Sequence, residues 1–183
     1  MKKTIFLTAI VCLLAISAFA QKKADYSGNW TLHVSKSKLD ERARIESMTM
    51  TVTQTDKDIK VETATKRTPP PADVQGNGQG GGRRGGGFGG GDGTTVYTLD
   101  GKETSVETES PAGKMPVKLK AEFGKDGKLK LNQSRTFNSP IGEVSITTKE
   151  TWTLAEDGKT LTVKRDTESP RGTNSSEMVF TKK

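Results

Sequence analysis

The feature that most constrains this 183-residue chain is a two-residue alternation of apolar and polar side chains, which recurs from residue 26 onward. In one run, Met48, Met50 and Val52 alternate with threonines. This period is typical of β-strands with one buried face, because successive side chains of a strand point to opposite sides. Further runs of this kind lie at residues 30–34, 59–61, 117–123, 129–131, 144–154, 161–163 and 178–180.

Turn-forming pairs separate these runs, among them Asp100-Gly101, Asp126-Gly127 and Asp157-Gly158. Asp-Gly favours tight hairpins because both residues tolerate a positive φ. The pattern therefore predicts an all-β chain with about nine or ten antiparallel strands in an up-and-down meander. Closing a meander into a barrel removes its unpaired edges, and we expect one such barrel.

Two hairpins allow their register to be predicted. A two-residue turn at Asp157-Gly158 would place three inward pairs opposite each other, namely Leu154 with Leu161, Trp152 with Val163 and Glu150 with Arg165. A three-residue loop at residues 126–128 would pair Phe123 with Leu131, Ala121 with Gln133 and Leu119 with Arg135. In both hairpins the inward face becomes polar away from the turn.

The first twenty residues differ from the rest. Two lysines precede an apolar run that is too short to span a bilayer comfortably, and Ala18-Phe19-Ala20 has the pattern that a signal peptidase cleaves. We therefore predict a signal peptide at residues 1–20, a mature domain at residues 21–183 without a transmembrane segment, and a periplasmic or secreted bacterial protein. Cys12, the one cysteine, lies inside this segment, so the exported chain would have no disulfide and no thiolate ligand.

A Pro- and Gly-rich insert at residues 67–93 interrupts the strand pattern. Phe88 is the one large apolar residue among residues 76–93, so this stretch cannot offset its own ordering entropy. We predict a flexible loop within the single barrel domain. Its Arg83-Arg84 pair near Phe88 is similar to RGG-type tails, which leaves contact with a polyanion as an alternative.

The charge pattern argues against nucleic-acid binding. The full chain has a net charge of +7, and removal of two signal-peptide lysines lowers this to about +5. Lysines and glutamates are interspersed along the strands and form no basic stripe, so we expect no specific nucleic-acid partner. About a quarter of the mature residues are apolar, which excludes an integral membrane protein, a coiled coil and a large α/β enzyme.

The residues that carry enzyme chemistry are scarce. His33, the single histidine, alternates with Leu32 and Val34 and should face solvent, so a nucleophilic triad has no base. Glu103, Glu107 and Glu109 share one face of a short strand, for which a solvated edge is the simplest explanation. We expect no enzyme activity, no metal site and no cofactor.

Five polar residues occupy inward positions in otherwise apolar runs: Gln54, Gln133, Arg135, Glu150 and Arg165. A buried charge needs a partner, and the predicted register gives Glu150 to Arg165. Two interpretations stay open. The group is either a structural ion pair that plugs one end of the barrel, or a set of groups that orients the polar end of a ligand in an apolar pocket.

The string Ser27-Gly28-Asn29-Trp30 carries a G-x-W motif at the start of the first strand and resembles the lipocalin and wider calycin barrels. With the later string at residues 157–163, it is also similar to bacterial exported lipocalin-like proteins of unassigned function. The resemblance implies a lipocalin-like barrel in which Trp30 closes one end and a late-strand arginine packs across it. Arg165 is the best match for that arginine and Arg135 the second.

The resemblance also implies a carrier. We therefore predict an exported binding module for a small apolar or amphipathic molecule, monomeric, with a pocket lined by Trp30, Met50, Gln133, Arg135, Glu150, Trp152 and Arg165. The alternative is a structural or interaction protein of the cell envelope, with a solidly packed barrel and no ligand. A cavity of several hundred Å³ favours the carrier, whereas side chains that touch across the barrel axis favour the alternative.

Overall fold

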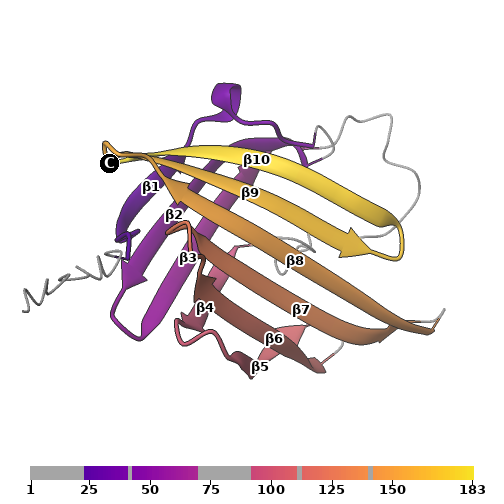
Figure 1. Cartoon of the computed structure of the whole chain (residues 1–183). Helices are drawn as coiled ribbons and strands as arrows, with labels where there is room; N and C mark the ends of the chain where they lie inside the picture. Colours follow the sequence, from indigo (N-terminus) through magenta and orange to yellow (C-terminus); the bar gives the residue numbers. More distant parts are fainter. Residues whose placement is uncertain (1–22, 41–42, 70–91, 111–112, 140–141) are drawn as a thin grey trace, which may run out of the picture.

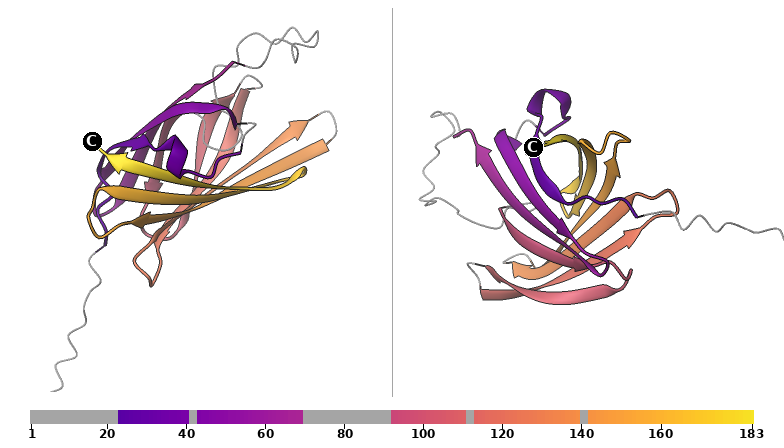
Figure 2. Two further views of the ribbon diagram at one scale, coloured as in Figure 1. Left: turned by 90° about the horizontal axis from the view of Figure 1, so that it is seen from above. Right: turned by 90° about the vertical axis from the view of Figure 1, so that its left-hand side faces the viewer.

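The computed structural model describes residues 23–40, 43–69, 92–110, 113–139 and 142–183. Its ten antiparallel strands form one sheet that curls into a nearly closed barrel, which confirms the predicted fold class (Figures 1 and 2). The strands are β1 (Gly28–Leu32), β2 (Ile45–Gln54), β3 (Asp58–Arg67), β4 (Gly93–Thr98), β5 (Glu103–Ser110), β6 (Gly113–Phe123), β7 (Leu129–Ser139), β8 (Gly142–Leu154), β9 (Thr160–Ser169) and β10 (Gly172–Lys182).

The predicted signal peptide and most of the predicted insert lie outside the described residues. Strand β3 runs to Arg67 and β4 begins at Gly93, so the regular sheet meets the insert at both of its ends. No helix within the described ranges has the length and apolar character needed to cross a membrane.

The barrel closes between the first strand and the last. Trp30 of β1 pairs with Lys182 of β10, and β1 pairs with β2 on its other side. Strand β1 is short, so the connection after it covers the rest of β10: Lys38 bridges to Glu177, and the Ser37 hydroxyl accepts a hydrogen bond from the Val179 N–H. This connection contains the 3₁₀ turn η1 (Val34–Lys36).

The ladder is broken between β4 and β5, although only residues 99–102 separate them. The backbone of this link bonds to opposite sides of the gap, because the Leu99 N–H donates to the Lys57 carbonyl and the Gly101 N–H donates to the Ala121 carbonyl. The link therefore spans from β3 toward β6 instead of folding β5 back along β4. Val106 of β5 consequently stays 40% exposed, even though its partner Val117 of β6 is buried.

The register of the β8–β9 hairpin is as predicted, with Trp152 opposite Val163 and Glu150 opposite Arg165. The prediction of a two-residue turn at Asp157-Gly158, however, is wrong. The Ala155 N–H donates to the Thr160 carbonyl at 2.8 Å, which closes a four-residue loop. Of the loop residues, only Gly158 has a positive φ. The Asp157 carboxylate accepts hydrogen bonds from the N–H groups of Lys159 and Thr160, which favours the wider loop and holds the pKa of Asp157 below its usual value.

The predicted β6–β7 register is wrong by two residues. The closing pair is Gly124 and Lys128, and the three-residue loop ends on Gly127 at φ 76°. A type I turn needs its left-handed residue at the last loop position, and the prediction had placed the glycine in the middle. The observed pairs are Phe123 with Leu129, Ala121 with Leu131, Leu119 with Gln133 and Val117 with Arg135. A shift by two leaves every side chain on its predicted face.

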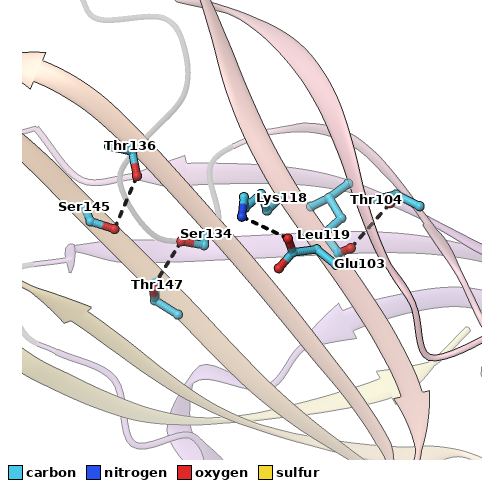
Figure 3. A network of polar contacts seen from close by, with 8 residues as sticks. All are labelled: Glu103, Thr104, Lys118, Leu119, Ser134, Thr136, Ser145 and Thr147. Carbon is cyan, nitrogen blue, oxygen red and sulfur yellow. Dashed lines mark hydrogen bonds and ion pairs between the residues drawn. The ribbon is translucent and has the colours of Figure 1, made fainter.

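Small polar residues and ion pairs cover much of the outer face, as Figure 3 shows for β5 to β8. Ser134 and Thr147 face each other across β7 and β8 at 3.3 Å, and Lys118 forms an ion pair with Glu103 at 3.0 Å. Glu107 pairs with Lys114 in the same way, while the Glu109 side chain lies outside the described part. Glu103 and Glu107 are exposed, in agreement with a solvated edge, and His33 is also exposed.

Candidate functional site

The interior of the barrel has two unlike halves. The half beside the β2–β3, β6–β7 and β8–β9 turns, called here the closed end, is packed by side chains that meet across the axis. Tyr26, Trp30, Ile59, Leu129 and Leu161 are each no more than 1% exposed there. The closed end therefore has the solid packing expected of the structural alternative.

Tyr26 is the central contact of the closed end. Its hydroxyl donates to the Trp152 carbonyl at 3.0 Å and accepts a hydrogen bond from the Leu129 N–H at 3.3 Å. Its ring packs edge-on against Trp152 at 5.8 Å. Burial raises the pKa of Tyr26 above its ordinary value, and the Leu129 hydrogen bond partly opposes that shift. The tyrosine thus joins β7 and β8 to the segment before β1.

Trp30 lies at the closed end, away from the pocket predicted to contain it. Its indole Nε1 donates to the Tyr26 carbonyl at 2.9 Å. The cation across its ring is Lys182 of β10, whose Nζ lies 5.4 Å from the ring centroid. The resemblance implied an arginine at this place, and that prediction is wrong. Gly28 lies beside this lysine, and a Cβ there would meet the Lys182 Cε, so the lysine side chain would have to move.

Gln54 is also at the closed end, and both its amide nitrogen and its amide oxygen make hydrogen bonds. Its Nε2 donates to the Ala24 carbonyl, and its Oε1 accepts a hydrogen bond from the Tyr26 N–H. This inward polar side chain therefore fixes the segment before β1 against β2.

The other half of the interior holds a pocket of about 170 Å³, called here the pocket. It contains six of the seven predicted ligand-binding residues, all except Trp30: Met50, Gln133, Arg135, Glu150, Trp152 and Arg165. The remaining lining residues escaped prediction: Val61, Thr63, Asp92, Gly93, Thr94, Thr95, Tyr97, Thr108, Val117 and Leu131. Strands β4 and β5 both contribute to this lining, so the pocket lies beside the break in the ladder.

Glu150 and Arg165 form the predicted ion pair, with 2.6 Å between Oε1 and Nε. Their side chains are 13% and 17% exposed, so the pair is internal. The second carboxylate oxygen of Glu150 accepts a hydrogen bond from the Trp152 indole at 2.7 Å. Both oxygens of this carboxylate are therefore in use.

Arg135 and Gln133 face the same pocket from β7, opposite Val117 and Leu119. Among the described residues, neither side chain has a hydrogen-bond or ion-pair partner. Burial lowers the pKa of the Arg135 guanidinium, although arginine stays charged at physiological pH.

Tyr97 of β4 adds a further polar group to the pocket lining. Burial raises the pKa of its hydroxyl, with a further contribution from the charge of Glu150, while Arg165 and Arg135 oppose the shift. The described part of the chain offers no hydrogen-bond partner to this hydroxyl. An alternation of Thr95, Tyr97 and Leu99 before Asp100-Gly101 is the sequence signal that would have identified it.

A second hollow, of about 340 Å³, lies on the outer face of β6 to β9. Within it, Lys120 pairs with Glu122. Two further charged residues of its lining bind partners outside it: Lys149 pairs with Glu168, and Asp166 accepts a hydrogen bond from the Ser175 hydroxyl. This hollow therefore presents mostly satisfied surface charges.

Within the described ranges, no three His, Cys, Asp or Glu side chains gather closely enough to hold a metal ion. No protein-family model, curated protein or solved structure matches the chain.

Proposed function

We propose that this chain is a lipocalin-like, exported, non-enzymatic binding module for a small amphipathic molecule. The observation that carries the proposal is the pocket, whose lining combines the apolar side chains of Met50, Leu131 and Trp152 with several polar side chains. Ligand sites commonly combine an apolar lining with a few convergent polar groups.

The pocket volume limits the size of the ligand. A volume of about 170 Å³ is smaller than the several hundred Å³ predicted for a carrier and below the range of roughly 300 to 1,000 Å³ that holds drug-sized molecules. An apolar cavity of about 150 Å³ in another protein binds benzene. The volume therefore supports a ligand whose buried part is about one ring in size.

Binding of a neutral one-ring probe tests this function directly. We expect benzyl alcohol to shift the amide NMR signals of pocket residues, and the variant Thr63→Phe, which fills the pocket from β3, to weaken binding at least ten-fold. The matched control is Thr53→Phe, since Thr53 is exposed and lies outside the pocket lining. Equal binding by both variants would place the probe elsewhere and refute the pocket as its site.

The structural alternative rests on the packing of the closed end. It predicts that protein purified from its source carries no small molecule and that no one-ring probe enters the pocket. Native mass spectrometry of that protein separates the two proposals, because a bound organic molecule supports the binding module.

A further inference from the structure

The polar groups of the pocket divide into satisfied and unsatisfied ones. Glu150 is satisfied, because Arg165 and Trp152 bind its two carboxylate oxygens. The ion pair of this carboxylate is made with Arg165 and not with Arg135. In the described part of the chain, the guanidinium of Arg135 thus lacks an anionic partner.

Among the internal groups of the pocket, cations exceed anions by one. Arg135 and Arg165 face one internal carboxylate, that of Glu150. Asp92 also lines the pocket, but it is exposed and its carboxylate accepts a hydrogen bond from the Thr65 backbone at 2.5 Å. Solvent screens an exposed carboxylate strongly, so it compensates an internal cation poorly.

The donors beside Arg135 are suited to an anion. Arg135 carries up to five N–H donors, the Gln133 amide carries two and the Tyr97 hydroxyl carries one. All three side chains line the same pocket, and none is used by another described residue. Hydrogen bonds from a guanidinium to a carboxylate are stronger than those between neutral groups.

From this geometry we infer that the ligand is a small monocarboxylate, with its carboxylate on Arg135 and its apolar body against Met50, Leu131 and Trp152. One negative charge balances the one excess cation. A body of about one ring fills the volume. This inference rests on the proposed function and adds the charge of the ligand to it.

Sodium benzoate and benzamide test the inference, because they share one ring and differ in charge. Binding of each is measured by isothermal titration calorimetry to the unmodified mature protein, to Arg135→Met and to Lys130→Met. Lys130 lies on the same strand as Arg135 but is exposed, so its substitution removes the same charge outside the pocket.

We expect the unmodified protein to bind benzoate at least ten-fold more tightly than benzamide. Arg135→Met should abolish that preference, because the variant lacks the cation that distinguishes a carboxylate from an amide. Lys130→Met should retain the preference.

Two outcomes overturn the inference in different ways. If benzamide binds as tightly as benzoate, or if Arg135→Met keeps the preference, the pocket binds a small molecule but does not select an anion, and the proposed function survives. If neither probe binds the unmodified protein, both the carboxylate assignment and the proposed function fail.

Discussion

The two ends of the barrel interior treat inward polar groups differently. At the closed end, the Gln54 amide and the Tyr26 hydroxyl each make two hydrogen bonds within the chain. In the pocket, the Gln133 amide and the Tyr97 hydroxyl have no such partner among the described residues. A glutamine and a tyrosine thus stabilise the fold at one end, while the same two residue types at the other end have polar groups that a ligand can bind.

The largest expected difference between the ends concerns packing. Trp30→Ala should destabilise the fold by about 3 to 5 kcal/mol, because it empties a fully enclosed site and removes the bond to the Tyr26 carbonyl. Urea unfolding followed by fluorescence measures this loss, since Trp152 remains as the single tryptophan. A loss below about 1.5 kcal/mol would show that the closed end is not tightly packed.

The second-largest loss of stability is expected when the internal ion pair is broken. Glu150→Ala should cost about 3 kcal/mol, because Arg165 would remain charged in a poorly hydrated site. The double variant Glu150→Ala/Arg165→Met should recover much of this loss in urea unfolding. A single-variant loss under about 1 kcal/mol would mean that the pocket is hydrated well enough to make the pair equivalent to a surface pair.

The two tyrosines provide a matched comparison at smaller magnitude. Tyr26→Phe should cost about 1 to 3 kcal/mol, because it leaves the Leu129 N–H and the Trp152 carbonyl without their hydroxyl partner. Tyr97→Phe should change stability by less than about 0.5 kcal/mol, because its hydroxyl has no partner to lose within the described chain. Equal losses in urea unfolding would remove the distinction between the ends.

Substitution of Arg135 should change the stability in the opposite direction. Arg135→Met replaces a half-buried, unpaired cation by an apolar side chain of similar length, and we expect a gain on the order of 1 kcal/mol in the absence of ligand. Lys130→Met, on the outer face of the same strand, should be nearly neutral. Destabilisation of Arg135→Met by 1 kcal/mol or more would show that the arginine has a structural role.

Much of this arrangement follows from the sequence, because the side-chain period of a strand fixes which residues point inward. That period predicts Gln133, Arg135, Glu150 and Arg165 as inward residues, and the predicted β8–β9 register places Glu150 opposite Arg165, as the structure does. The predicted β6–β7 register is wrong by two residues. The residues predicted to point inward still do so, because a shift by two residues leaves each side chain on the same face of the sheet.

Other features depend on long-range contacts that no local pattern encodes. The break between β4 and β5 arises because the N–H groups of Leu99 and Gly101 bond to opposite sides of the gap. The closure of β1 on β10 likewise places Lys182 over Trp30, where the resemblance implied an arginine. The break lies beside the pocket, so the sequence predicted residues of the pocket better than its volume.

The two tryptophan indoles test the central claim most directly, since one lies at each end. Trp30 Nε1 donates within the closed end, whereas Trp152 Nε1 donates to Glu150 in the pocket. When benzoate is added, the Trp152 indole NMR signal should shift in a saturable manner and the Trp30 signal should stay in place. A shift of the Trp30 signal alone, or no shift of either signal at millimolar benzoate, would contradict the account.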